Sequence, residues 1–314
     1  MEIDLLGTAG PRGWPEAGCR CASCTRMRAA RRGLEPTRVL LDGVPLDRCR
    51  RREVPGGYDV RTPRGHRVLF AAGPGARPEP AGPEPYDAVL LDLIGDPSHL
   101  GRLRRAGAVT DGTRIEAVHV DHRVASPAEL DRRLGFWARP ASGPWRSLVL
   151  GGSRSGKSEE AELRVMAHPE VTYVATGIMH ADDPEWRDRI TAHRRRRPGW
   201  WDTAETIDLA GLLRDATGTL LIDGMGTWLT AVFDALGAWE QPQAVAPRLD
   251  ELVGAWRSTR AHVVAVSDEV GLSIVPATAS GRAFRDTLGR LNQRLAAESE
   301  ETALVVAGRV VDLP

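Results

Sequence analysis

The second half of the chain alternates short apolar stretches with amphipathic ones. The apolar stretches have the length of strands and cover 147–150, 171–176, 219–224, 262–269 and 302–313. Between them, 247–261 and 284–299 carry apolar residues at helical spacing. Short apolar strands that alternate with amphipathic helices are typical of a mostly parallel sheet with helices on both faces. The pattern therefore predicts an α/β domain over residues 144–314.

The first half mixes the same two signals in a less regular order. Its strand-like stretches are 3–8, 37–43, 66–72 and 86–95, and a helical pattern covers 126–137. Two Pro/Gly-rich segments interrupt the chain, an irregular loop at 72–85 and an interdomain linker at 138–145. We predict a separate α/β domain over residues 1–143, whose topology the pattern does not give.

Charge and composition narrow the partners. The chain has 42 basic and 42 acidic residues, so nothing in its net charge favours a nucleic acid or an anionic membrane as partner. No apolar run is long enough to cross a bilayer. The N-terminal stretch MEIDLLGTAGPRG carries acids where a signal peptide carries bases. We expect a soluble cytoplasmic protein.

A glycine-rich stretch carries the strongest chemical signal. Residues 151–158, GGSRSGKS, satisfy G-x-x-x-x-G-K-[ST] and lie between a predicted strand and a predicted helix, as that pattern requires. The loop amides can surround phosphate oxygens, and the helix directs its positive end to the same place. The predicted nucleotide-binding residues of this loop are Gly151, Gly152, Ser153, Arg154, Ser155, Gly156, Lys157 and Ser158.

Lys157 is the only lysine of the chain, and arginine makes up 41 of the 42 basic residues. A compact ammonium on a flexible stem can reach the β- and γ-phosphates inside the loop, whereas a guanidinium is broader and prefers a bidentate partner. We expect Lys157 to be catalytic and Ser158 to place its hydroxyl on Mg²⁺. Asp223 ends an apolar strand, where P-loop folds place the second Mg²⁺ group; the alternative is a turn aspartate before Gly224.

A run of four arginines follows the second predicted strand of this half. The run is Arg194, Arg195, Arg196 and Arg197, and Pro198 comes next. Most such runs are solvated, but guanidinium groups also bind polyphosphates. His193 precedes the run, and a neutral imidazole beside phosphates can attack phosphorus and carry a nucleotidyl group. His193 is therefore a candidate nucleophile, with a structural histidine as the alternative.

Residues 144–314 resemble the bifunctional adenosylcobinamide kinase / adenosylcobinamide-phosphate guanylyltransferase family of cobalamin biosynthesis. The resemblance rests on GGSRSGKS followed in order by YVATG (173–177), RITAHRRRRP (189–198), LLIDGMGTWLT (220–230), VSDEVGLSIVP (266–276) and FRDTLGRLNQRLA (284–296). It implies a P-loop NTPase domain of the RecA-like type, with adenosylcobinamide and GTP or ATP as substrates. It also implies a homo-oligomer.

The resemblance further implies two reactions. A γ-phosphate passes to the hydroxyl of adenosylcobinamide; GTP then guanylylates a histidine, and the GMP passes to the cobinamide phosphate, which gives adenosyl-GDP-cobinamide. The family's guanylylated histidine matches His193 in the pattern R-I-x-x-H-x-x-x-R-P. The family's nucleotide contacts carry over to the glycine-rich loop, Ala175, Thr176, Gly177, the arginine run with Pro198, Glu205 and Asp223.

The chain departs from this family at two acids, and two other functions stay open. Asp268 stands where family members often carry Asn, and Asp223 stands where some carry Glu. A P-loop kinase of another small molecule would need no histidine step. A nucleotide-gated regulator would use the first half of the chain as its effector.

The first half contains the cysteine cluster CRCASC. Residues 5–33 resemble the opening of a phosphodiesterase-like metallo-β-lactamase-fold hydrolase. That resemblance implies that Cys19, Cys21 and Cys24 contribute to a structural Zn²⁺ site with His119 or His122 as fourth ligand. Three free thiols in a loop are the alternative.

The catalytic pattern of that fold, H-x-H-x-D-H, is missing where it should follow the strand at 86–91. The segment DLIGDPSHLG keeps only His99, and the whole first half has four histidines, His66, His99, His119 and His122. A dinuclear metal centre needs more ligands than these histidines supply. We therefore predict a truncated, degenerate metallo-β-lactamase-like α/β domain without catalysis.

Overall fold

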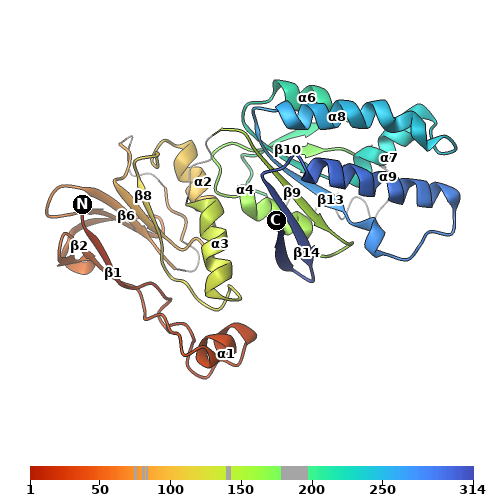
Figure 1. Cartoon of the computed structure of the whole chain (residues 1–314). Helices are drawn as coiled ribbons and strands as arrows, with labels where there is room; N and C mark the ends of the chain where they lie inside the picture. The colour runs from red at the N-terminus through yellow and green to blue at the C-terminus, as the bar shows by residue number, and fades with distance from the viewer. Residues whose placement is uncertain (74–75, 80–81, 83, 139–142, 178–196) are drawn as a thin grey trace. The chain divides into compact units, whose positions relative to one another are not determined.

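The computed structural model of the chain describes residues 1–73, 76–79, 82, 84–138, 143–177 and 197–314 (Figure 1). The chain divides into two compact units, each of which is described by itself. The first unit is Met1–Pro140 with Met166–Pro169, and the second is Ala141–Val165 with Glu170–Pro314. Within the described residues, no helix combines the length and the apolar character that a membrane span requires.

A seven-stranded sheet organises the second unit. Its strand order is β11-β10-β12-β13-β9-β14-β15. The strands are β9 (Trp145–Gly151), β10 (Thr172–Ala175), β11 (Asp202–Glu205), β12 (Thr219–Asp223), β13 (His262–Asp268), β14 (Glu301–Val306) and β15 (Arg309–Leu313). All neighbours pair in parallel except β14 and β15. The predicted mostly parallel sheet is confirmed, and the carboxyl ends of β9, β10, β12 and β13 share one edge.

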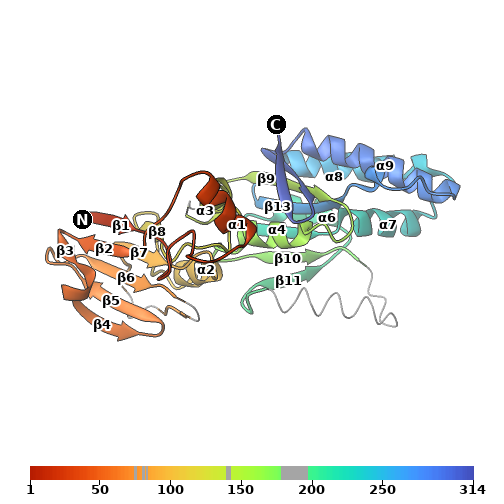
Figure 2. The ribbon, with the colours of Figure 1, turned by 90° about the horizontal axis from the view of Figure 1, so that it is seen from below.

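Helices cover both faces of this sheet (Figures 1 and 2). Helix α4 (Lys157–Val165) lies against one face. The other face carries α6 (Leu209–Asp215), α7 (Met225–Leu236), α8 (Ala246–Ser258) and α9 (Ala279–Ala296). Alternate strand residues such as Leu148, Ile222 and Val263 pack there against Trp256 and Leu288, and all five are at most 2% exposed. This buried core fixes the strand ends, which is what a site built on them requires.

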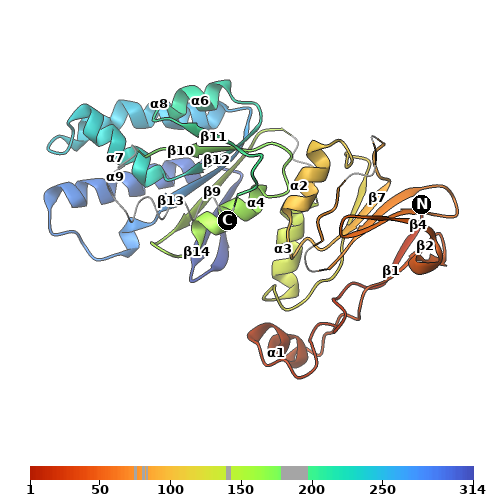
Figure 3. The same ribbon diagram turned by 180° about the vertical axis from the view of Figure 1, so that it is seen from behind.

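In the part of the first unit that the structure describes, two sheets are accompanied by α-helices (Figure 3). Strands β1 (Ile3–Gly7), β2 (Arg38–Leu41) and β3 (Val44–Pro45) form a three-stranded sheet, and β4 (Arg50–Val54), β5 (Gly57–Arg61), β6 (Arg67–Ala71), β7 (Ala88–Leu91) and β8 (Arg114–Ala117) form a five-stranded one. The helices are α1 (Ala22–Ala29), α2 (Ser98–Arg105) and α3 (Pro127–Trp137). Ile3 and Leu41 of the small sheet pack on Val60, Val68 and Leu90 of the large one.

Candidate functional site

The turn between β9 and α4 depends on its glycines. A Cβ at Gly151 would collide with the side chain of Ser155 and lie 2.7 Å from the carbonyl oxygen of Val305. Gly156 has a φ of +97°, which L side chains rarely adopt. The turn is therefore held close to the sheet, and its backbone N–H groups are the groups that would contact phosphate oxygens.

Lys157, the first residue of α4, folds back over this turn. Its Nζ donates a hydrogen bond to the Gly152 carbonyl oxygen at 3.2 Å and forms an ion pair with Asp268 Oδ1 at 2.7 Å. Asp268 is the last residue of β13 and is paired in register with Gly151. The ammonium thus lies between the turn and the end of the neighbouring strand, where a polyphosphate tail would need it.

Ser158 and Asp223 meet at the same edge of the sheet. Ser158 Oγ donates to Asp223 Oδ1 at 3.1 Å, and the hydroxyl of Tyr173 donates to Asp223 Oδ2 at 2.9 Å. Burial, with the charge of Asp223, raises the pKa of Tyr173 far above its usual range, so this hydroxyl stays protonated and remains a donor. Hydroxyl and carboxylate oxygens are hard ligands of the kind that Mg²⁺ takes.

Of the arginine run, the structure describes Arg197, which lies beside Tyr173. The guanidinium carbon of Arg197 lies 3.4 Å from the centroid of the Tyr173 ring, a cation–π contact. His193 and the arginines Arg194, Arg195 and Arg196 lie outside the described residues. Pro198 follows Arg197 and is half-buried.

The remaining predicted nucleotide contacts lie at or just beyond strand ends. Ala175 ends β10 and is in register with Asp223 on one side and with Glu205, which ends β11, on the other. Thr176 Oγ1 donates to the Gly224 carbonyl oxygen at 2.7 Å, which ties the loop after β10 to the loop after β12. Glu205 is exposed, and Gly177 closes the described stretch.

Three residues at this edge were not predicted as site residues. Tyr173 and Asp268 contact Asp223 and Lys157 directly. Asn292 of α9 is buried and holds the end of β13: its Nδ2 donates to the Asp268 carbonyl oxygen at 3.1 Å and to Glu269 Oε1 at 2.9 Å. All three lie inside motifs that carry the family resemblance, but only the fold brings them to one edge.

Known proteins share this half of the chain. The sequence model of the family "Cobinamide kinase / cobinamide phosphate guanyltransferase" matches residues 147–313. The chain belongs to this family. The "Bifunctional adenosylcobalamin biosynthesis protein CobU" of Salmonella typhimurium is 39% identical over 176 residues, which cover 51% of this chain and 95% of that protein.

Two further relatives match 51% and 52% of the chain. The protein of the same name from Escherichia coli is 36% identical over 174 residues and the "Bifunctional adenosylcobalamin biosynthesis protein CobP" of Pseudomonas aeruginosa is 36% identical over 168 residues. The alignments cover 95% and 94% of those proteins. The interpretation of this half as a cobinamide kinase and guanylyltransferase of adenosylcobalamin biosynthesis is confirmed at the level of the family.

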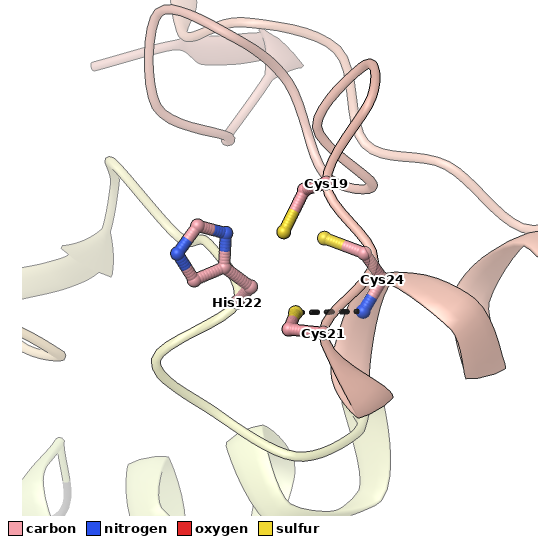
Figure 4. A group of neighbouring side chains, drawn as sticks. All are labelled: Cys19, Cys21, Cys24 and His122. Atoms are coloured by element: carbon pink, nitrogen blue, oxygen red, sulfur yellow. Dashed lines mark hydrogen bonds between the residues drawn. The ribbon is translucent and has the colours of Figure 1, made fainter.

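A second group of side chains gathers in the first unit. The ligand atoms of Cys19, Cys21, Cys24 and His122 all lie within 4.8 Å of one another, and Figure 4 shows them directed toward a common centre. His122, and not the alternative His119, joins the cysteines. All four cysteines of the chain are free thiols.

The surroundings of this group suit thiolate and imidazole ligands. Cys24 N donates to Cys21 Sγ at 3.4 Å, and this hydrogen bond lowers the pKa of Cys21. Burial raises the pKa of Cys24 to about 11, so without a cation that thiol stays neutral. Nδ1 of His122 lies 3.6 Å from Glu16 Oε2, so a carboxylate can orient the imidazole.

The other histidines of this unit are dispersed. Nε2 of His99 lies 3.3 Å from Asp96 Oδ2, and Nδ1 of His66 lies 3.6 Å from Asp42 Oδ2. Asp92 follows β7 and is 4% exposed. Both of its carboxylate oxygens accept a hydrogen bond from Arg123 Nη2, at 3.0 and 3.1 Å. Among the described residues, the cysteine–His122 group is the one cluster of three or more His, Cys, Asp or Glu ligands that could hold a metal.

Proposed function

We propose that residues 144–314 bind a nucleoside triphosphate with its phosphate tail in the 151–158 turn and use it in both reactions of the family. The observation that carries the proposal is the contact of Ser158 with Asp223, because it brings the acid predicted at the end of another strand to the turn that carries Lys157 and Ser158. A RecA-like arrangement is supported by β13, which lies between the strand of the turn and the strand of Asp223.

In the kinase reaction, the protein supplies positioning and charge. Lys157 neutralises the β- and γ-phosphates, and the loop amides fix the oxygens around them. Ser158 and Asp223 would hold Mg²⁺, which would supply positive charge against the charge that develops on the phosphates. Tyr173 keeps the Asp223 carboxylate oriented through its hydroxyl. The acceptor is the hydroxyl of adenosylcobinamide.

In the guanylyl reaction, His193 attacks the α-phosphorus of GTP, pyrophosphate leaves, and GMP passes to the cobinamide phosphate. This assignment comes from the family motif, since His193 lies outside the described residues. It is supported by Arg197, which follows His193 by four residues. Arg197 lies over the Tyr173 ring, and the Tyr173 hydroxyl contacts Asp223. Arg194–Arg197, Pro198, Ala175–Gly177 and Glu205 complete the nucleotide site.

A product assay tests this assignment. The full chain is incubated with adenosylcobinamide, GTP and Mg²⁺, and the corrinoids are identified by mass spectrometry. We expect the wild type to form the phosphate and then the GDP derivative, and His193→Ala to stop at the phosphate. Equal loss of both products in the variant would argue against a covalent role for His193.

We also propose that Cys19, Cys21, Cys24 and His122 hold a structural Zn²⁺. Three thiolates and one imidazole are a common closed donor set for zinc, with Zn–S distances of about 2.3 Å. A tetrahedron of that size places its ligand atoms about 3.8 Å apart, so the observed limit of 4.8 Å needs only a small contraction. Purified full chain should contain one zinc per chain by elemental analysis, and a metal-free wild type would refute the site.

The rest of the first unit is proposed to be a degenerate metallo-β-lactamase-like domain without hydrolytic activity. The engagement of Asp92 by Arg123 supports this, since the carboxylate after β7 is neutralised by a guanidinium. The dispersed His66 and His99 give it further support. Assays with Mn²⁺ or Zn²⁺ and phosphodiester substrates should show no turnover above that of a heat-denatured sample.

A further inference from the structure

The Asp268 carboxylate forms an ion pair with the lysine of the proposed phosphate site. Asp268 Oδ1 lies 2.7 Å from Lys157 Nζ, and the Lys157 side chain is only 13% exposed. The Gly152 carbonyl oxygen is the second acceptor for the same ammonium. A bound polyphosphate and the Asp268 carboxylate would both need the ammonium as their counter-ion.

Asp268 differs from the neighbouring acids in how it is engaged. Asp223 accepts a hydrogen bond on each carboxylate oxygen, from Ser158 and from Tyr173. Glu269 accepts one from Asn292. Within the described part of the chain, the hydrogen bonds and ion pairs of the Asp268 side chain involve Lys157 alone, and the side chain is 38% exposed.

A buried side chain holds the backbone at Asp268. Asn292 donates to the Asp268 carbonyl oxygen and itself accepts from Ser267 Oγ at 2.6 Å, inside the core. A Cβ at Gly226, in the first turn of α7, would lie 3.0 Å from Asp268 Oδ2. The carboxylate is thus carried beside Lys157 on a fixed backbone, and a bound phosphate and Asp268 would be two negative groups at one ammonium.

We propose that Asp268 is a positioning residue that competes with the β- and γ-phosphates for Lys157. It keeps the ammonium in the turn while the site is free of nucleotide, and it weakens the binding of any ligand that carries those phosphates. By the same electrostatics it speeds the departure of nucleoside diphosphate and pyrophosphate. This inference rests on the proposed nucleotide site but adds an opposing group to it.

The chemistry of the ligand provides a selective test. GTP, GDP and pyrophosphate carry the phosphates that need Lys157, whereas GMP does not. In the variant Asp268→Asn, the residue keeps its shape and can still accept a hydrogen bond, but its charge is gone. Removing a partly exposed charge next to a phosphate is expected to tighten binding about threefold to tenfold.

Isothermal titration calorimetry on the full chain would measure Kd for GTP, pyrophosphate and GMP. We expect Asp268→Asn to tighten GTP and pyrophosphate and leave GMP unchanged, and Asp268→Glu to restore the wild-type values in part. The gain should shrink as salt is added. Glu269→Gln is the matched control, since it removes an adjacent charge that Asn292 and not Lys157 engages; its Kd values should stay within twofold.

The possible failures are distinguishable. Weaker GTP binding in Asp268→Asn would show that the carboxylate pre-organises Lys157 for the phosphate and would overturn the competition. Equal tightening of GMP, or equal tightening in Glu269→Gln, would indicate a general charge effect and would also overturn it. If the wild type binds GTP and Asp268→Asn binds it with the same Kd, this inference alone is refuted. If the wild type binds neither GTP nor ATP, the proposed function is refuted as well.

Discussion

The two candidate sites of this chain are held in place by different means. The groups around Lys157 lie at the ends of strands β9, β12 and β13, whose buried residues fix them from the core of the sheet. The cysteine–His122 group combines Cys19 and Cys21 before α1, Cys24 in the first turn of α1, and His122 on the irregular segment after β8. The first site is therefore preorganised by packing, whereas the proposed zinc would cross-link the separate segments of the second. Removing zinc should disturb the cysteine–His122 group and leave the fold around Lys157 unchanged.

The largest effect is expected for Lys157→Arg. The broader guanidinium cannot follow the ammonium into the turn, so both reactions should fall on the order of 10²–10³-fold. Steady-state rates of corrinoid phosphorylation and guanylylation measure the loss. The surface variant Arg294→Lys should keep the wild-type rates, because Arg294 of α9 pairs with the exposed Asp250 of α8, away from the strand ends. A near-normal Lys157→Arg enzyme would contradict the role given to the only lysine.

Cys24→Ser tests the other half of the comparison. Loss of one thiolate should remove the zinc and lower the stability of the first unit by roughly 3 kcal/mol, because metal binding and folding are coupled. Elemental analysis and a thermal melt detect both changes, and nucleotide binding by the second unit should persist. Cys49→Ser is the control, because this buried thiol lies outside the cluster. Unchanged metal content in Cys24→Ser would remove the proposed site.

Acid should affect the second unit through a partly buried histidine. Burial lowers the pKa of His262 to about 4, whereas an unfolded histidine titrates near about 6.5. Below about pH 6.5 the unfolded state binds a proton at this histidine, whereas the folded state binds it only near about pH 4. The free energy of unfolding therefore falls as the pH drops. Between pH 7 and pH 5 the loss should be roughly 2 kcal/mol. Hydrogen exchange of β13 should show it in the wild type and not in His262→Gln.

The smallest effect is expected for Tyr173→Phe. The change removes one hydrogen bond to the Asp223 carboxylate and leaves the ring beneath Arg197. Loss of one such bond is worth about 1 kcal/mol, so the Mg²⁺-dependent rates should fall about threefold to tenfold, with a higher Mg²⁺ requirement. Tyr58→Phe, in the first unit, should change neither value. A Tyr173→Phe enzyme with wild-type Mg²⁺ dependence would detach Tyr173 from the metal site.

The sequence pattern predicts the second unit better than the first. Its strands are continuous apolar runs because both faces of the sheet are covered, and the predicted positions of β9, β10, β12, β13 and β14 agree with the structure. The edge strand β11 escapes prediction because DTAE is polar and largely exposed. The hairpin of β4 and β5 escapes for the same reason, since RRREV presents five residues of which none is buried.

The site shows a similar division. The motif pattern identifies Lys157, Ser158 and Asp223 one by one, because each has a recognisable place in a P-loop fold. Their partners depend on strand register: Asp268 reaches Lys157 because it is in register with Gly151, and Tyr173 reaches Asp223 from the neighbouring strand. The choice of His122 over His119 likewise depends on the path of the loop after β8, which no spacing rule gives.

Labelling with α-³²P-GTP tests the central claim most directly. The full chain is incubated with Mg²⁺ and the nucleotide, and protein-bound label is measured after denaturation, with γ-³²P-GTP in parallel. We predict that the α-label stays on the wild-type protein in an acid-labile bond, is absent from His193→Ala, and passes to phosphorylated cobinamide when that acceptor is added. Wild-type protein that phosphorylates cobinamide but never retains the α-label would contradict the account.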